Sequence, residues 1–268
     1  MNINGLTVSD RHSKPRTQGL TWCIDDGMPL HAFSDTIASF HRLIDGVKFG
    51  WGTALVTDCL RDKMAVCRQY DVEYCFGGTL VEAYWMQNRM EDFIRLVRAS
   101  QCPVVEVSDG TVHLPLAERR RLIRELKAYA RVFSEVGSKS PEASATWTAQ
   151  HWIEQIKRDH RSGADLIILE TRESGTAGLC QPNGAIRSDV SEGILASTLD
   201  PSYLMFEAPT KALQTYWILQ LGATVNLSNI PLTAVVNLET LRLGLRSDTF
   251  SLLLAASAIL PSAIMASH

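Results

Sequence analysis

Eight short runs of β-forming residues recur along the chain, and a stretch with helical periodicity follows each of them. The runs cover residues 20–27, 45–53, 72–79, 103–111, 131–139, 165–175, 203–209 and 223–231. Eight β/α repeats in 268 residues have the size and rhythm of a closed (β/α)8 barrel, the TIM barrel. We therefore expect one α/β domain over residues 1–268.

Both ends of the chain lie outside this repeat. Residues 1–18 contain no apolar core of a secretory signal, so we expect a flexible lead-in whose later part covers one end of the barrel. Residues 251–268 are apolar but are interrupted by Pro261, and their apolar part is shorter than the ~20 residues that a membrane span needs. We expect this extension to pack on the barrel or on another subunit of a homo-oligomer, with a membrane anchor as the alternative.

Charged and amide side chains stand where the β-rich runs stop. The chemistry of such barrels takes place at the carboxyl ends of the strands. A charge beside a buried strand is costly unless it is paired or takes part in chemistry. The side chains in question are Asp25, Lys48, Glu106, Asp109, Glu135, Lys139, Glu170, Arg172, Glu207 and Asn226.

Three glutamates end the fifth, sixth and seventh runs and would be neighbours in a barrel: Glu135, Glu170 and Glu207. Converging carboxylates repel one another unless a cation or a shared proton relieves them. Oxygen ligands suit a hard divalent ion, and Mg²⁺ is the ion we predict. The alternative is that each glutamate pairs with a neighbouring cation, such as Arg172 or Lys48.

Lysines and small polar groups at the same ends predict an anionic ligand. A lysine there can bind phosphate, form a Schiff base or donate a proton, and Lys48 and Lys139 are the two candidates. Loops after the last two strands of barrels often bind phosphate. The hydroxyl and amide candidates, for which a plain turn is the alternative, are Thr53, Thr79, Thr111, Asn226, Ser228 and Asn229.

Charge and cysteine usage narrow the setting. The net charge of −3 and the absence of a basic stripe argue against a nucleic-acid binder. The six cysteines contain no CxxC pair and several lie in apolar patterns, so we expect free thiols in a reducing cytoplasm. The run Arg119–Arg121 is interpreted as the solvated face of an amphipathic helix.

Many short motifs occur in a fixed order between Lys14 and Phe250. They are KPRTQGLTWCIDDG, VKFGWGT, GGTL, VEVSDGT, LPLAERRRLIR, SEVGSK, GADLIILETRESG, FEAP, VNLSNIP and LETLRLGLRSDTF. In this order they resemble the phosphosulfolactate synthase family, whose members open the archaeal coenzyme M pathway. The resemblance implies a (β/α)8 barrel that adds sulfite to phosphoenolpyruvate, giving (2R)-phospho-3-sulfolactate, with Mg²⁺ as cofactor.

The resemblance also implies roles for particular residues. Lys139 matches the second of two adjacent lysines in the family pattern, where Ser138 replaces the first, and it is the expected general acid. Glu135, Glu170 and Glu207 are expected to hold the metal, directly or through water. Lys48 and Arg172 are expected to act on the reacting anions. The expected substrate-binding set is Asp25, Thr53, Thr79, Ser174, Asn226, Asn229 and Arg246.

The chain departs from the family pattern at Thr171, Ser228, Leu243 and Ser247. These changes put the substrate in question more than the type of reaction. Two alternatives therefore stay open. One is a related addition to phosphoenolpyruvate with a different nucleophile, such as phosphite, and the other is a non-catalytic barrel of the stress-associated kind.

Overall fold

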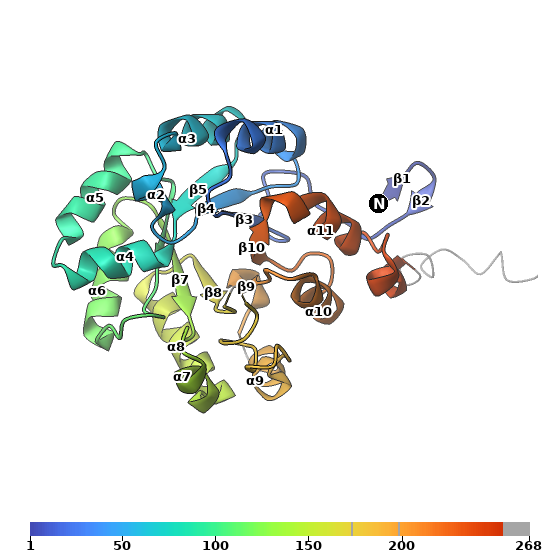
Figure 1. Cartoon of the computed structure of the whole chain (residues 1–268). Coiled ribbons are helices and arrows are strands. Elements are labelled where there is room, and N and C mark those ends of the chain that lie inside the picture. Colours follow the sequence, from blue (N-terminus) through green and yellow to red (C-terminus); the bar gives the residue numbers. More distant parts are fainter. Residues whose placement is uncertain (173, 198, 254–268) are drawn as a thin grey trace, which may run out of the picture.

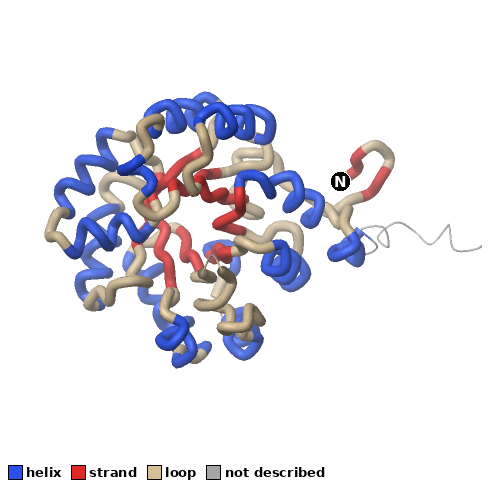
Figure 2. Tube along the Cα trace, viewed as in Figure 1, coloured by secondary structure: helices blue, strands red, loops and turns tan. Residues whose placement is uncertain are grey.

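The computed structural model describes residues 1–172, 174–197 and 199–253. Eight parallel strands form one sheet in the order β5-β4-β3-β10-β9-β8-β7-β6, which curls until its two edges, β5 and β6, lie side by side. The fold is thus the expected (β/α)8 barrel (Figures 1 and 2). The strands are β3 (Thr21–Asp25), β4 (Gly46–Phe49), β5 (Glu73–Phe76), β6 (Val104–Val107), β7 (Arg131–Val136), β8 (Leu166–Leu169), β9 (Leu204–Glu207) and β10 (Leu227–Pro231).

Helices surround the sheet on its outer side (Figure 2). They are α1 (Leu30–Phe40), α2 (Thr53–Val56), α3 (Leu60–Gln69), α4 (Gly78–Met86), α5 (Met90–Ala99), α6 (Leu116–Leu126), α7 (Pro141–Thr146), α8 (Ala149–Ser162), α9 (Ser188–Leu195), α10 (Lys211–Leu221) and α11 (Val235–Arg242). The helix α7 lies inside the stretch 137–147, which looks irregular in the sequence. Thr148 caps α8 by accepting a hydrogen bond from the backbone N–H of His151.

Side chains point alternately into the barrel and out toward the helices, as the period of two in a strand requires. On β7, Phe133 belongs to the cluster inside the barrel, whereas Val132 and Val136 pack in the outer core. The next inward position, Glu135, lines the cavity at the mouth of the barrel. The same step from an apolar to a charged inward residue occurs on β6, β8 and β9.

The inside of the barrel is therefore layered. Its lower layer is apolar and includes Trp22, whose indole lies against β4 at Gly46. A Cβ on Gly46 would stand 2.5 Å from that ring, so this position requires glycine. The upper layer carries the charges. The rings of Trp22 and Phe133 pack against each other in the lower layer, and the charged layer faces the cavity at the carboxyl ends of the strands.

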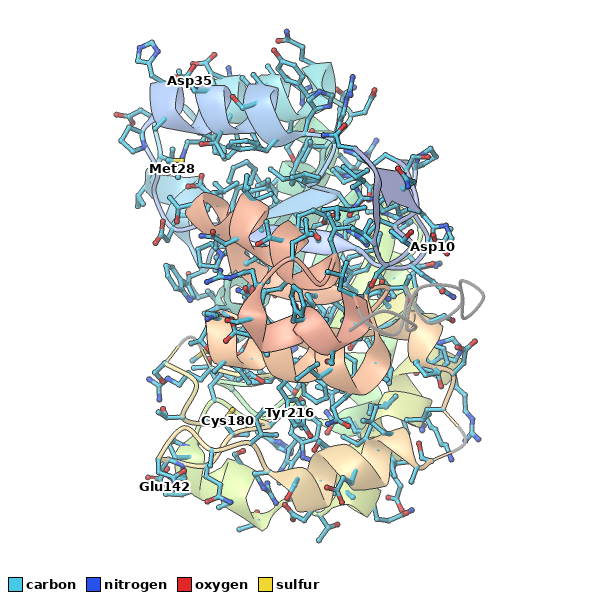
Figure 3. All side chains as sticks on the ribbon, turned by 90° about the vertical axis from the view of Figure 1, so that its right-hand side faces the viewer. Asp10, Met28, Asp35, Glu142, Cys180 and Tyr216 are labelled. Atoms are coloured by element: carbon cyan, nitrogen blue, oxygen red, sulfur yellow. The ribbon has the colours of Figure 1, made fainter. Side chains whose placement is uncertain are left out.

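The amino end of the barrel is covered by the segment before β3. The ammonium group of Lys14 donates to the backbone carbonyls of His41, Ile44 and Asp71, and Arg16 pairs with Asp45 at 3.2 Å. Residues ahead of this segment form a small hairpin of β1 (Asn2–Ile3) and β2 (Leu6–Thr7). In the side view, Asp10 lies at this end and Met28 lies toward the other (Figure 3).

Several sequence-based expectations can be compared with this architecture. All six cysteines are free. No helix among the described residues is long and apolar enough to cross a membrane. Most of the apolar extension, residues 254–268, lies outside the described part of the chain, so its packing stays a prediction.

Candidate active site

A cavity of about 840 Å³ opens at the carboxyl ends of the strands. Because β4, β6, β7 and β9 each present their last inward side chain there, and Glu170 directly follows β8, charges from distant parts of the sequence meet in one space. Its charged lining consists of Asp26, Lys48, Glu106, Glu135, Lys139, Glu170, Arg172 and Glu207. Such a cavity, with few polar groups fixed on rigid strands, is the usual form of a catalytic pocket in a barrel.

Three carboxylates form the centre of the cavity. Glu135, Glu170 and Glu207 each offer an oxygen, and these oxygens lie within 4.8 Å of one another. All three side chains are buried, and one oxygen of Glu170, Oε2, has no hydrogen-bond partner. Burial raises the pKa of Glu170 well above its ordinary value, and the charges of Glu207 and Glu135 add to the effect. The geometry fits a hard divalent cation, since an ion would relieve the repulsion and occupy the unpartnered oxygen.

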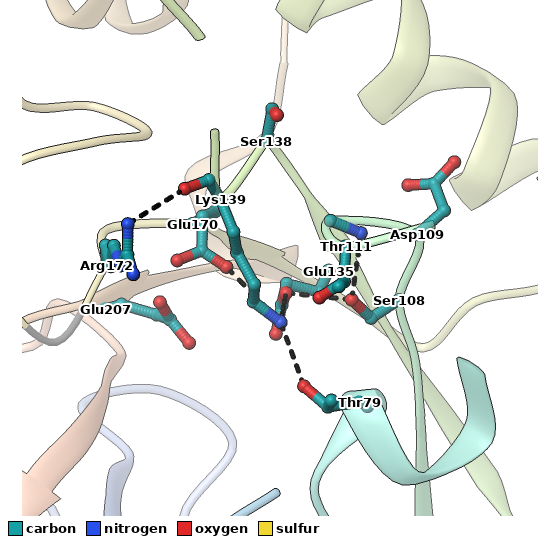
Figure 4. A network of polar contacts seen from close by, with 12 residues as sticks. Thr79, Ser108, Asp109, Thr111, Glu135, Ser138, Lys139, Glu170, Arg172 and Glu207 are labelled. Carbon is teal, nitrogen blue, oxygen red and sulfur yellow. Dashed lines mark hydrogen bonds and ion pairs between the residues drawn. The ribbon is translucent and has the colours of Figure 1, made fainter. Parts of the chain in front are cut away.

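Lys139 reaches into this carboxylate group from the loop after β7 (Figure 4). Its Nζ lies 2.9 Å from Glu135, 3.3 Å from the hydroxyl of Thr79 and 3.9 Å from Glu170. Burial by itself would lower the pKa of Lys139, but the charges of Glu135 and Glu170 outweigh it and raise the pKa. Conversely, burial alone would raise the pKa of Glu135, but Lys139 and Lys48 hold it below its ordinary value.

Lys48 is the second cation and lies deeper in the barrel. Its Nζ is 2.9 Å from Glu106 and 3.2 Å from Glu207. Burial raises the pKa of Glu106 to about 7 against the opposing effect of Lys48. Glu106 also accepts a hydrogen bond of 2.7 Å from the backbone N–H of Gly78, at the start of α4. Lys48 therefore joins the two sides of the cavity, from β6 to β9.

Two further predicted residues lie at the cavity. Arg172 is exposed at the rim, where its guanidinium donates to the backbone carbonyl of Lys139 at 3.4 Å. Asn229 adopts a left-handed backbone with φ of 55°, a conformation that asparagine tolerates better than most residues. Its side-chain amide donates to Glu207 at 2.6 Å. Ser138, where the family pattern has a lysine, points away from the carboxylates (Figure 4).

Other predicted substrate-binding residues have partners outside the cavity. Asp25 is buried, pairs with Lys63 at 2.5 Å and accepts from the backbone N–H groups of residues 27 and 28. The hydroxyl of Thr53 donates to the carbonyl of its own loop at residue 50. Ser174 bonds to a neighbouring threonine and Arg246 stands 4.0 Å from an aspartate of its own turn. Through these backbone hydrogen bonds Asp25 holds the loop after β3 in shape. The next residue in that loop, Asp26, lines the cavity.

The structure corrects the expected position of Asn226. This residue comes just before β10, and its side chain binds backbone groups of Leu20, Ser202 and Leu204 at the amino ends of neighbouring strands. It is therefore at the end of the barrel opposite to the cavity. The run 223–231 is longer than the strand that it contains, and the sequence does not show where in the run the strand begins.

The interpretation of Arg119–Arg121 as a solvated face is wrong for Arg119. Its guanidinium is buried behind β7, where it pairs with Asp109 and Asp159, bonds to Ser134 and donates to the backbone carbonyl of Glu135. This network fixes the strand that carries a central carboxylate. The sequence does indicate this burial, because Arg119 lies on the same face of α6 as the buried residues three, four and seven positions later.

Sequence reasoning also missed Glu82 and Ser108. Glu82 is buried on α4 and accepts from the backbone N–H groups of Thr111 and Val112. The hydroxyl of Ser108 lies 2.6 Å from Glu82 and 3.0 Å from Glu135. Five carboxylates thus surround the two lysines of this site, and the anionic groups are in excess.

Fold and site together define a (β/α)8-barrel enzyme with a buried group of carboxylates and lysines at the mouth of its barrel. The sequence matches the family described as (2R)-phospho-3-sulfolactate synthase (ComA) over residues 9–248. The chain belongs to this family.

Curated relatives carry the same name. The phosphosulfolactate synthase of Bacillus subtilis is 42% identical over 252 residues, which cover 94% of this chain and 100% of the relative. The phosphosulfolactate synthase of Methanothermobacter thermautotrophicus is 35% identical, over 93% of this chain and 98% of the relative. That of Methanocaldococcus jannaschii is 36% identical, over 87% of this chain and 94% of the relative.

Solved structures agree with the fold. The carboxyl transferase domain of Rhizobium etli pyruvate carboxylase superposes with a TM-score of 0.56 at 11% identity, covering 82% of this chain and 41% of that chain. A phosphonopyruvate hydrolase in complex with oxalate and Mg²⁺ gives a TM-score of 0.51 at 14% identity, over 81% and 77% of the two chains. At these identities the likeness concerns the barrel alone.

Proposed function

We propose that this protein adds sulfite to phosphoenolpyruvate and forms (2R)-phospho-3-sulfolactate, with Mg²⁺ as cofactor. The observation that carries the proposal is the convergence of Glu135, Glu170 and Glu207 around the ammonium group of Lys139 in one cavity. Membership of the synthase family gives the proposal its substrates.

The chemistry requires charge neutralisation followed by protonation. The sulfur lone pair of sulfite forms a bond to C3 of phosphoenolpyruvate, and the electrons of the C2–C3 double bond move onto the carboxylate. A proton added to C2 then completes the product. Mg²⁺ held by Glu135, Glu170 and Glu207 would stabilise the charge that builds on the carboxylate. Oε2 of Glu170, which accepts no hydrogen bond and stands 3.9 Å from Nζ of Lys139, supports this assignment.

Lys139 is the proposed acid for the second step. The carboxylates around it raise its pKa, so the proton stays on Nζ until a stronger base, the electron-rich C2, is formed beside it. Its contacts with Glu135 and Thr79 hold Nζ within the cavity. Arg172 at the rim and Lys48 deeper in the barrel would neutralise the two anionic substrates on either side.

The test is incubation of the purified protein with phosphoenolpyruvate, sulfite and Mg²⁺, with mass spectrometry of the product. We expect a mass equal to the sum of phosphoenolpyruvate and sulfurous acid, lost on treatment with EDTA and restored by Mg²⁺. Full activity in rigorously metal-free protein would remove the metal from the proposal. A product formed only with phosphite would favour a different nucleophile, and no product with any anion would favour a non-catalytic barrel.

We further propose that the protein works in the cytoplasm as a homo-oligomer on small anionic substrates, without nucleic-acid or membrane partners. Free cysteines support the reducing compartment. The oligomer rests on the apolar character of residues 251–268, which would be unfavourable in water without a partner surface.

A further inference from the structure

The loop that follows β6 is folded around a single buried carboxylate. Glu82 enters from α4, and its Oε2 accepts the backbone N–H groups of Thr111 at 3.0 Å and Val112 at 2.7 Å. Its Oε1 takes the hydroxyl of Ser108 at 2.6 Å. The hydrogen bonds of Glu82 thus go to both ends of the loop 108–112. The ammonium group of Lys139 stands farther from this carboxylate, at 4.0 Å from Oε1.

The same loop supports the whole length of Lys139. The backbone N–H of Lys139 donates to the carbonyl of Gly110 at 3.1 Å. A Cβ built on Gly110 would stand 3.2 Å from Cγ and Cδ of Lys139 and 3.3 Å from Cε. These are the three nearest atoms, so the aliphatic stem of the lysine lies flat over the glycine. The backbone N–H of Gly110 is in turn held by the hydroxyl of Ser108 at 3.2 Å.

The loop 108–112 and the ammonium group of Lys139 both contact Glu135. Ser108 lies 3.0 Å from Oε1 of Glu135, and Nζ of Lys139 lies 2.9 Å from the same oxygen. Figure 4 shows Ser108 and Thr111 beside Glu135, and the side chain of Lys139 extending toward Glu135. The loop therefore fixes the lysine relative to a carboxylate that the loop itself touches.

We propose that Glu82, Ser108 and Gly110 form a positioning platform for Lys139. Glu82 holds the loop in shape through hydrogen bonds, and Gly110 supplies a flat surface on which the lysine stem lies. None of the three is assigned a bond to substrate. The proposal rests on the proposed function only where it uses turnover as a readout, because the position of Lys139 can be measured without any substrate.

Gly110→Ala is the sharpest test. The added methyl group changes no charge, meets only the lysine stem among its three nearest atoms, and would displace that stem by a few tenths of an ångström. Misplacement of a reacting group by about 1 Å can cost about 100-fold in rate, so a displacement of a few tenths of an ångström should lower kcat by about threefold to tenfold. The KM for phosphoenolpyruvate should stay within about twofold, because a positioning defect acts on the chemical step rather than on uniform binding.

Gly52→Ala is the matched control. Gly52 lies in the loop after β4 at the same end of the barrel, has no positive φ, and a Cβ there would meet nothing within 4 Å. We expect this variant to behave as wild type. A Gly110→Ala enzyme with wild-type kcat, or one whose loss lies wholly in KM, would overturn the platform.

Glu82 is tested by comparing two substitutions. Glu82→Gln keeps an oxygen acceptor for the N–H groups of Thr111 and Val112, whereas Glu82→Ala removes it. We expect the alanine variant to lose at least about tenfold in kcat and the glutamine variant to recover most of that loss. If both variants lost the same activity, Glu82 would act through its charge on Lys139, and the platform would be refuted.

A substrate-free readout separates this proposal from the proposed function. The rate at which acetic anhydride labels Lys139 can be followed by peptide mass spectrometry in the presence of Mg²⁺. We expect Gly110→Ala to raise this rate relative to wild type and to Gly52→Ala, because the added methyl group displaces the lysine stem from the surface of the loop. Unchanged labelling of Lys139 would overturn the platform, whatever product the wild-type enzyme makes. Failure of the wild type to join sulfite to phosphoenolpyruvate would instead remove only the proposed function.

Discussion

Glu170→Gln should separate the metal site from the stability of the barrel. Glu170 is buried, its Oε2 has no hydrogen-bond partner, and burial with two neighbouring carboxylates raises its pKa. The folded protein therefore retains the Glu170 proton to higher pH than the unfolded chain does. As pH rises from the ordinary value of 4.5 toward the raised pKa, the metal-free wild type loses stability. Each unit of raised pKa corresponds to a loss of about 1.4 kcal/mol across that window.

The glutamine side chain has no proton to lose and is close in shape to the protonated acid. The metal-free variant should therefore be at least as stable as wild type near the upper end of the window. Mg²⁺, in contrast, should stabilise the wild type more than the Glu170→Gln variant. At 100 times its Kd, an ion stabilises a folded protein by about 2.7 kcal/mol. At roughly 2–4 °C per kcal/mol, this raises the Tm of wild type by about 5–10 °C.

Removal of one of three carboxylate ligands weakens this effect. If binding falls about 100-fold, the same Mg²⁺ concentration contributes only about 0.4 kcal/mol, a shift of about 1 °C. Thermal unfolding followed by intrinsic fluorescence, with and without Mg²⁺ and from pH 5 to pH 8, measures both effects. Glu154→Gln, at an exposed glutamate paired with Arg158 on α8, should keep the full Mg²⁺ shift. A Glu170→Gln protein with the wild-type shift would refute Glu170 as a metal ligand, and a marked loss of metal-free stability would refute the pKa argument.

Three other predictions concern separate parts of the molecule. Lys139→Ala should abolish product while phosphoenolpyruvate still binds by calorimetry, and Lys139→Arg should also fail because guanidinium is a poor proton donor; near-normal turnover of the alanine variant would move the acid to Lys48. Arg119→Ala leaves the buried Asp159 and the partly buried Asp109 without their cationic partner, so urea unfolding should show a loss of about 3–5 kcal/mol, and an unchanged midpoint would contradict the buried network. Deleting residues 251–268 should change the species on a sizing column or cause aggregation; an unchanged, soluble species would argue against a tail-dependent oligomer.

The barrel could be predicted because its strands carry a signal that does not depend on distant contacts. Each of the eight strands lies within one of the β-rich runs, and each run stops at turn residues. The inward carboxylates can also be predicted, since Glu135 and Glu207 occupy the last inward position of their strands and Glu170 directly follows β8. The pattern does not show where within a long run the strand begins, and Asn226 therefore lies before β10 rather than at the expected carboxyl end.

Partners of buried charges were harder to predict for a physical reason. Arg119 reads as one of three consecutive arginines, and only its partners from β7, α8 and the loop at Asp109 make its burial favourable. Asp109 belongs to the same β/α repeat, but Ser134 and Asp159 come from later parts of the fold, up to 40 residues away. A sequence pattern shows which face of a helix a residue occupies, but it does not show whether another element places a residue of opposite charge against that face.

The pairing of Glu106 restricts where a substrate anion can bind. The start of α4 offers the backbone N–H of Gly78, and helix starts are favourable places for phosphate or carboxylate. Here Glu106 already occupies that N–H at 2.7 Å while it pairs with Lys48. On the opposite side, the exposed guanidinium of Arg172 stands at the rim of the cavity, where it contacts the backbone carbonyl of Lys139. We therefore expect one anionic group of the substrates to lie toward the loop after β8, beside Arg172, rather than at the start of α4, which Glu106 already occupies.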